Sequence, residues 1–291
     1  MADFLNFFTE PLAFQFFQRA MFALVIVGGL SAVVGSFVVV RGMAFFGDAL
    51  AHTILPGVAL SYTASGGSIG SNLFVGGMGA GVVSALVIAY LTRNERLKED
   101  TAIAIVFVTM FALGIAIIST QGSYSQDLSH ILFGSIYGIS ETDLMVMAGI
   151  SLVVLVIIAL LYKELVIISF DMSLAHTLKL PVETLRITLL ILIAVTIVAS
   201  LQAVGIALML ALLITPAATA RLLFKRLPSM IVASAIIGIS SGIVGFYVSY
   251  YLDVPSGASI VLTMSSVFTV VFVLTSLWDM VRANKQTTQT A

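Results

Sequence analysis

Residues 41–60 read RGMAFFGDALAHTILPGVAL, and this stretch decides what kind of protein the chain is. It places one acid, Asp48, and one imidazole, His52, four residues apart in apolar surroundings. Positions i and i+4 of a helix share a face, so the two side chains are expected to lie together. From residue 49 to residue 92 there is no Asp, Glu, Lys or Arg. A carboxylate inside a membrane-spanning helix costs about 2.5–3.5 kcal/mol on insertion scales, so Asp48 predicts a polar path or a cation site.

The composition of the whole chain predicts an integral membrane protein. Hydrophobic residues make up 60% of the 291 residues and charged residues 9%, against roughly 25% charged in a soluble domain. Several apolar runs reach the length that a spanning helix needs, which favours an all-α fold. The net charge of −1 is uninformative, and the sequence shows no basic surface for nucleic acid. The absence of cysteine excludes disulfides and thiolate metal sites.

Charged residues divide the apolar sequence into membrane spans. The first lies between Arg19 and Arg41. The long uncharged window after Asp48 is interrupted by the turn-rich segment 64–72 and therefore predicts two spans. The clear spans are expected at about 20–40, 48–63, 72–92, 101–120, 142–162, 230–250 and 257–278.

A stretch of 34 uncharged residues, 187–220, could cross the membrane once or twice. Cytoplasmic loops collect Lys and Arg, and this rule decides between the two. Two crossings that meet near residues 202–205 place 12 of the 13 basic residues in the cytoplasm, the exception being Arg19. We therefore expect about nine spans, within a range of eight to ten, with an outer N-terminus and a cytoplasmic C-terminus.

Asp48 and His52 are the candidate metal ligands. An oxygen and a nitrogen ligand together suit Mn²⁺, Fe²⁺ or Zn²⁺, whereas Mg²⁺ and Ca²⁺ prefer oxygen alone. Two ligands make a weak site, which suits a conduit because a transported ion must also leave. Pro56 and Pro216 lie inside predicted spans, and helices broken at membrane depth often line such a site. The residues alone leave an alternative open, namely an Asp–His ion pair that only holds helices together.

The segment 170–181 is expected to form a short helix in a cytoplasmic loop between two spans. Asp171 or Ser173 can cap its start, and Pro181 follows its end. The apolar side of this helix, at helical spacing, consists of Leu174, Ala175 and Leu178. Such a helix can dock a cytoplasmic partner, and the alternative is a helix that lies on the membrane surface.

The outer loop 121–141 contains a second histidine and acid that bear on metal entry. Asp127 and His130 lie three residues apart there, and the predicted outer segments carry acids but no Lys or Arg. An acidic outer face attracts cations. A surface histidine without a metal role is the simpler interpretation of His130.

The sequence lacks the features of an enzyme. No phosphate-binding loop of the form GxxxxGK[ST] is present, so the chain is not expected to hydrolyse a nucleotide by itself. An intramembrane hydrolase would need a plausible set of catalytic residues, and the sequence lacks one. We also expect no covalently bound cofactor.

The segment from Gly35 to Leu60 strongly resembles the signature of permease subunits of bacterial ABC importers for manganese, zinc and iron. The form of residues 55–59, Leu-Pro-Gly-Val-Ala, is more similar to the manganese and iron branch than to the zinc branch. The family usually has glycine near the end of its coupling helix, where this chain has Lys179. The similarity continues in order and spacing through the segments 99–103, 132–134, 163–165, 170–171, 202–205, 211–218 and 255–258.

The resemblance implies that residues 1–291 form a single transmembrane permease domain with the fold of the vitamin B12 and siderophore importers. Its cargo would be Mn²⁺, with Zn²⁺ and Fe²⁺ as other candidates, and its location the bacterial cytoplasmic membrane. Asp48 and His52 match the family's pathway acid and histidine. The helix at 170–181 matches the coupling helix that docks the ATPase. The implied partners are a second copy of the chain, cytoplasmic ATPase subunits that hydrolyse ATP, an extracytoplasmic metal-binding protein and membrane lipid.

The alternative from a different class is an ion-coupled secondary metal transporter that works alone. Asp48 and His52 would then form a proton relay. The two hypotheses differ in whether an ATPase and a binding protein associate with the chain.

Overall fold

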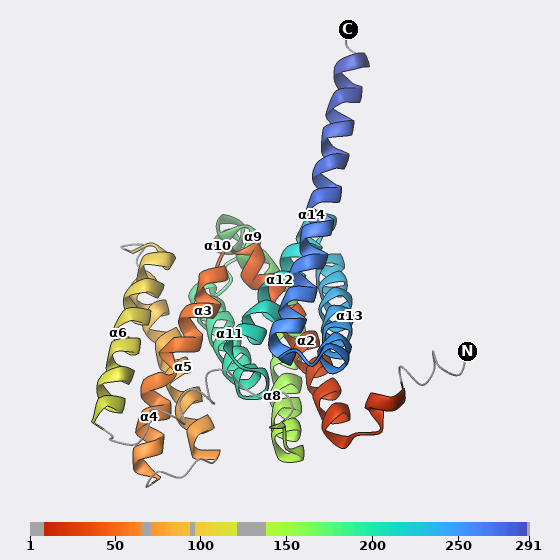
Figure 1. The fold of residues 1–291 in the computed structure, drawn as a ribbon. Coiled ribbons are helices and arrows are strands. Elements are labelled where there is room, and N and C mark those ends of the chain that lie inside the picture. The colour runs from red at the N-terminus through yellow and green to blue at the C-terminus, as the bar shows by residue number, and fades with distance from the viewer. Residues whose placement is uncertain (1–8, 66–70, 94–96, 121–137, 290–291) are drawn as a thin grey trace.

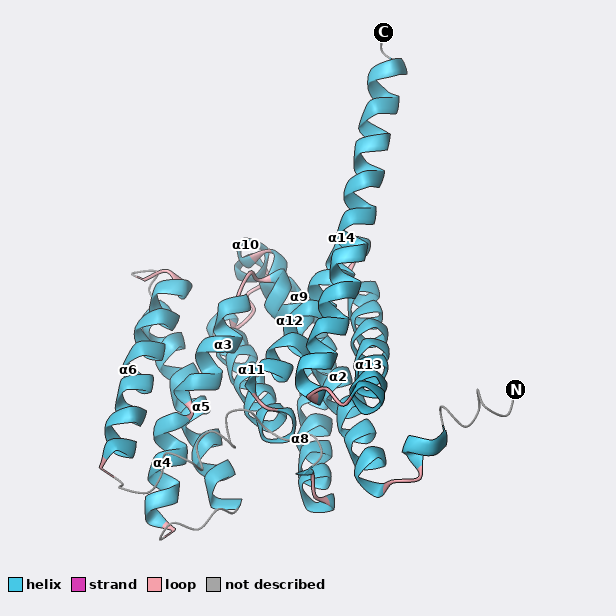
Figure 2. Ribbon diagram, viewed as in Figure 1, coloured by secondary structure: helices cyan, strands magenta, loops and turns pink. Residues whose placement is uncertain are grey.

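The computed structural model describes residues 9–65, 71–93, 97–120 and 138–289, and within these ranges the chain is helical without a strand (Figures 1 and 2). In this described part, nine helical segments are long and apolar enough to cross a membrane. The expected all-α, multi-pass architecture is therefore confirmed. The nine candidate spans are Gln15–Val40, Ala44–Ala64, Leu73–Thr92, Glu99–Ser119, Glu141–Leu160, Val182–Leu201, Ile206–Leu223, Leu227–Leu252 and Ser256–Met280.

Most spans consist of one helix each, whereas the second consists of two short helices that meet at Ile54. The single helices are α2 (Gln15–Val40), α5 (Ser71–Thr92), α6 (Glu99–Ser119), α8 (Glu141–Leu160), α11 (Val182–Val204), α12 (Ile206–Leu223), α13 (Leu227–Leu252) and α14 (Ser256–Gln289). The second span is divided into α3 (Ala44–Thr53) and α4 (Leu55–Ala64). Two further helices, α9 (Tyr162–Phe170) and α10 (Met172–Thr177), connect α8 to α11.

The uncharged stretch 187–220 crosses twice, as the distribution of basic residues predicts. Helix α11 ends at Val204, and α12 begins at Ile206. The single residue between them, Gly205, has φ 77° and ψ 171°, a conformation that is almost exclusive to glycine. Its N–H still donates to the carbonyl of Leu201 at 2.9 Å, so the backbone reverses with little loss of hydrogen bonding.

The two proline-containing spans behave differently from one another. Pro56 is the second residue of α4, directly after the break at Ile54. Pro216 lies inside α12, and the helix continues through it to Leu223. The expected break at Pro216 is therefore wrong, while the one near Pro56 is confirmed. At Pro216 the ring packs against the helix α13, where Gly238 leaves space for it.

Helix α11 lies in the middle of the bundle and contacts α2, α3, α5, α8, α9 and α12 (Figure 1). In the membrane-spanning stretch of α11, 72% of the residues are buried, whereas the corresponding share for α14, at the edge of the bundle, is 11%. On one side of it α3, α4, α5 and α6 pack together, and on the other α2, α12, α13 and α14 do. The buried apolar side chains form one cluster that runs through both groups.

Helices α9 and α10 lie at one end of the bundle, together with the connection from α2 to α3, the end of α5 and the start of α6 (Figure 1). The last part of α14 extends from the same end, clear of the other helices. Sequence patterns predict α10 within 170–181, and its observed length is six residues. They do not predict α9, whose residues belong to a loop in that prediction. Leu165 and Ile168 are buried and hold α9 against the bundle.

Helices α2 and α12 approach one another so closely that only glycine fits between them. A Cβ atom on Gly35 would lie 1.8 Å from the carbonyl oxygen of Leu213. Gly57 and Gly76 produce a similar approach of α4 and α5, because a Cβ on Gly57 would lie 2.1 Å from the Gly76 oxygen. In a bilayer, such approaches supply the van der Waals packing that holds helices together.

Substituting Gly35 tests this packing. Gly35→Ala is expected to destabilise the protein by at least about 1–3 kcal/mol, because an overpacked methyl group forces α2 away from α12. Gly29, on the same helix, is the matched control, since a methyl group added there would meet no neighbouring helix or side chain within 4 Å. Gly29→Ala should leave stability unchanged or slightly raised. Thermal unfolding in detergent measures both, and equal midpoints for the two variants would contradict this account.

Candidate metal site

Asp48 and His52 lie on one face of α3, as their spacing predicts. The Nε2 atom of His52 is 3.8 Å from Oδ1 of Asp48, which is too far for a hydrogen bond. Ligand atoms at roughly 2.1 Å from one metal ion usually lie about 3.0–3.5 Å apart, so a small rotamer change would bring the pair to coordinating distance. The side chains are 43% and 29% exposed for Asp48 and His52 respectively, so a cation can reach both.

Two phenylalanines of α6 fix the imidazole of His52. Its ring meets Phe107 and Phe111 at centroid distances of 5.8 and 5.7 Å, in T-shaped arrangements. The two phenylalanines stack on one another at 5.9 Å. Their four-residue spacing predicts that they share a helical face, but nothing in the sequence indicates that this face meets α3. Such apolar walls strengthen electrostatic interactions with an ion by excluding water.

The helical hydrogen bonding of the backbone is interrupted next to His52. Pro56 has no N–H, so the carbonyl of His52, four residues earlier, lacks its usual helical donor and accepts from the N–H of Ile54 instead. The break therefore places a candidate metal ligand next to a main-chain oxygen without its normal partner. The Nδ1 atom of His52 is buried and has no hydrogen-bond partner among the described residues. Nε2, which faces Asp48, is thus the nitrogen available to an ion.

The described residues of one chain do not complete a metal site. They contain no group of three or more His, Cys, Asp or Glu side chains that could hold an ion together. Asp48 and His52 therefore supply one oxygen and one nitrogen, while transition metals in proteins commonly take four or more ligands. Further ligands would have to come from water, the main chain or another molecule. Asp127 and His130 lie outside the described residues, so their role in metal entry stays a prediction.

The candidate docking helix α10 begins with a side-chain cap. Oδ1 of Asp171 accepts a hydrogen bond from the N–H of Leu174 at 2.9 Å, the expected N-cap contact. Leu174 and Leu178 are 46% and 53% exposed, which leaves apolar surface on this helix for a partner. The sequence does not indicate that Phe170 and Met172 extend this surface, and both are also exposed.

Ala175 differs from the other residues expected at this docking surface, because it is fully buried. It packs α10 against the bundle, so a partner cannot touch it. The periodicity identified one apolar side of the helix, but this side is divided between the bundle and the exterior. The alanine lies on the bundle side because its small side chain lets a six-residue helix lie close to the helices beneath it.

Lys179, just after α10, has φ 54° and therefore lies in the left-handed region of backbone space. L-amino acids other than glycine pay about 1 kcal/mol or more for this conformation. Its N–H donates to the carbonyl of His176 at 3.0 Å, which closes the last turn. Glycine adopts this conformation without that cost, which fits the glycine that the resemblance implies near this place.

Comparison with known proteins identifies the family. The pattern of the family described as ABC 3 transport family matches residues 13–275. The chain belongs to the ABC 3 transport family. The resemblance found in the sequence motifs is therefore confirmed, and it extends over nearly all of the described residues.

Individual relatives agree with this assignment over their full lengths. The chain is 43% identical over 292 residues to the "Manganese transport system membrane protein MntC" of Halalkalibacterium halodurans, covering 98% of both chains. The solved structure "PsaBC from Streptococcus pneumoniae in complex with Fab" contains a chain that is 38% identical, with a TM-score of 0.79 and coverage of 92% of this chain and 95% of that one.

A more distant structure shares the fold alone. An inward-facing transporter of the metal-chelate ABC type matches with a TM-score of 0.68 at 18% identity, over 90% of this chain and 87% of its own. The expected fold of a membrane-spanning ABC transporter subunit is thereby confirmed for the arrangement of the helices.

Proposed function

We propose that this chain is the membrane-spanning permease subunit of an ABC importer that carries a divalent transition metal, with Mn²⁺ favoured, into the cytoplasm. The observation that carries the proposal is the Asp48–His52 pair. It is an exposed oxygen and nitrogen ligand pair in an otherwise uncharged span of a chain that belongs to the ABC 3 transport family. Zn²⁺ and Fe²⁺ accept the same ligands and stay as alternative cargoes. Membership of an ABC family does not favour a secondary transporter that works alone.

A second copy of the chain would complete the site. Two chains with their α3 faces opposed offer two carboxylates and two imidazoles, which is enough for a four-coordinate ion. The exposed side of Asp48 supports this arrangement, because a lone carboxylate facing lipid would be costly. A weak site shared between two subunits also allows release when the subunits move apart.

The energy for import would come from separate ATPase subunits that dock on α10. Its exposed apolar residues, with the Asp171 cap that stabilises a very short helix, support this docking. The chain itself would then carry out no hydrolysis and hold no resident cofactor, and residues 1–291 would act as one permease domain. An extracytoplasmic metal-binding protein would deliver the ion to the opposite face, in the cytoplasmic membrane of a bacterium.

Replacing the carboxylate tests the metal path. Asp48→Asn should reduce ATP-dependent Mn²⁺ uptake by at least about tenfold, because a neutral amide is a far weaker ligand than a carboxylate. His52→Ala should have the same effect. Uptake is measured in cells that lack their own importer, with membrane insertion checked by immunoblot. Asp253→Asn is the matched control, since Asp253 is an exposed acid in a turn and asparagine tolerates its left-handed backbone. Normal uptake by Asp48→Asn would rule out the proposed role.

Adding a charge to the exposed apolar surface of α10 tests docking. Leu174→Glu should abolish co-purification of the ATPase and the uptake that depends on it, because a carboxylate cannot be desolvated against an apolar partner surface. Leu174→Met, which preserves the apolar contact, should behave as wild type. Lys225→Glu, an added acid on another exposed loop, should still co-purify with the ATPase. Full association of the Leu174→Glu variant would favour the alternative of a helix lying on the membrane.

The proposed orientation can be measured by thiol labelling, because the chain has no cysteine of its own. A cysteine at Lys225 should resist an impermeant thiol reagent in intact cells and react after permeabilisation. A cysteine at Val254, which is exposed between α13 and α14, should react from outside. The expectation follows from the clustering of Lys and Arg on one side of the membrane. The opposite labelling pattern would invert the orientation of the whole bundle.

A further inference from the structure

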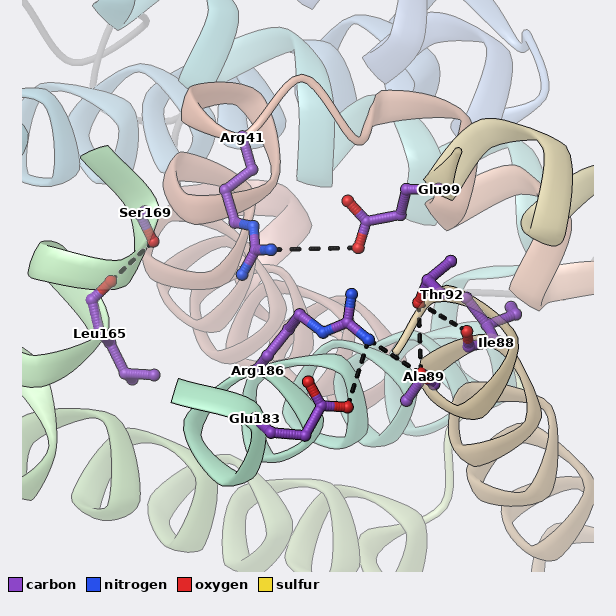
Figure 3. A network of polar contacts seen from close by, with 9 residues as sticks. All are labelled: Arg41, Ile88, Ala89, Thr92, Glu99, Leu165, Ser169, Glu183 and Arg186. Carbon is purple, nitrogen blue, oxygen red and sulfur yellow. Dashed lines mark hydrogen bonds and ion pairs between the residues drawn. The ribbon is translucent and has the colours of Figure 1, made fainter. Parts of the chain in front are cut away.

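Four charged side chains meet at the end of the bundle that carries α10 (Figure 3). Arg41, between α2 and α3, has a side chain only 5% exposed, and its Nη2 lies 3.9 Å from Oε1 of Glu99. Arg186, near the start of α11, is also buried. Its Nη2 donates to the carbonyl of Ala89 at 2.8 Å and approaches Glu183 at 3.4 Å.

The charged groups in this cluster are poorly satisfied. At 3.9 Å, the contact of Arg41 with Glu99 is an ion pair but not a hydrogen bond. Nη1 of Arg41, Oε1 of Glu99 and Nε of Arg186 are buried atoms without a hydrogen-bond partner in the described part of the chain. An unsatisfied buried group, particularly a charged one, carries a substantial desolvation penalty. A small movement of these side chains can therefore lower the free energy by giving the unpaired atoms hydrogen-bond partners.

Two arginines lie near one partly buried carboxylate here, that of Glu99, whose side chain is 26% exposed. Burial lowers the pKa of Arg41, Glu99 raises it, and the nearby charge of Arg186 lowers it again. Figure 3 shows the guanidinium of Arg186 next to the contact between Arg41 and Glu99. Glu183 is already paired with Arg186 and is more exposed than Glu99. Glu99 and Arg186 line the same cleft, so Glu99 is the acid available for a new pair with Arg186.

The chain segments that carry these residues are connected to both candidate functional regions, the Asp48–His52 pair and the docking helix α10. Arg41 lies three residues before the start of α3, which bears Asp48 and His52. Glu99 is the first residue of α6, which holds the His52 ring through Phe107 and Phe111. Arg186 belongs to α11, which follows the docking helix α10 after four residues.

A cleft joins the cluster to α10. It has a volume of about 500 Å³, and both Glu99 and Arg186 lie on its wall. Met172 and His176 of α10 form another part of the same wall. A shift of α10 therefore changes the space next to Glu99 and Arg186, and the cleft leaves room for their side chains to rearrange.

We propose that Glu99 is a positioning residue that exchanges between Arg41 and Arg186 when α10 moves. Paired with Arg41, Glu99 holds the start of α3 against the start of α6. Paired with Arg186, it releases Arg41 and lets α3 move relative to the phenylalanines that hold His52. The exchange thus transmits movement at the docking helix to the metal site, and it rests on the proposed function of the chain.

The test measures transport and ATP hydrolysis separately in the complete complex, reconstituted in vesicles with its ATPase. Glu99→Gln retains the size of the side chain but removes its charge. It should retain assembly, Mn²⁺ binding and ATP hydrolysis, while the Mn²⁺ imported per ATP falls by about tenfold or more. Glu141→Gln is the matched control, since Glu141 pairs with Arg19 on the exposed surface and should import as wild type.

A charge swap separates exchange from a static bridge. The variant Arg41→Glu/Glu99→Arg restores the pair between the two positions but places an arginine opposite Arg186. If Glu99 exchanges, this variant assembles while its import per ATP stays low. If the pair is only a static bridge, the swap restores import, and the proposal is wrong. If the Glu99→Gln variant fails to assemble, this double variant still distinguishes exchange from a static bridge.

The outcome distinguishes this inference from the proposed function. Absence of ATP-dependent Mn²⁺ uptake by the wild-type complex would overturn the proposed function itself. Wild-type uptake together with normal import per ATP in Glu99→Gln would leave that function standing and overturn the exchange.

Discussion

Every backbone N–H and C=O inside a bilayer needs a partner within the protein, and the other features of this structure depend on this constraint. It makes the described chain helical, and it makes any interruption of a helix costly. The one interrupted span among the described residues carries Asp48 and His52, and Pro56 prevents the His52 carbonyl from regaining its usual bond. By contrast, α12 continues through Pro216 at a place without charged residues. The chain has thus lost helical hydrogen bonding at the site where it also places ionisable side chains.

The number of spans could be predicted because two simple signals agree, namely charge-free length and the distribution of Lys and Arg. Even the division of residues 187–220 followed from the position of basic residues, and Gly205 forms the turn between the two helices. Helix α9 could not be predicted, because its residues mix apolar and charged side chains, and its buried residues, Leu165 and Ile168, are defined by contacts with the bundle. The ends of helices likewise depended on tertiary contacts that local patterns do not contain.

The candidate site could be predicted only in part, because the sequence shows which residues share a helical face but not which helices become neighbours. The spacing of Asp48 and His52 places them on one helical face, and helical geometry alone is enough to bring them together. The aromatic wall from α6 is not visible in the sequence, since it depends on which helices become neighbours. Ala175 illustrates the same limit, because apolar periodicity cannot tell a side that packs inward from one that faces a partner.

The contact between Gly35 and Leu213 has a consequence for motion. A point at which two main chains touch resists sliding of the helices, since sliding would drive side chains of either helix into the backbone of the other. Helices α2 and α12 are therefore expected to move together, with α13 and α14 packed onto them. Conformational change in the bundle is then rotational, with α3 turning relative to these helices and to α6. The short connection at residues 41–43, which joins α2 to α3, is the natural hinge.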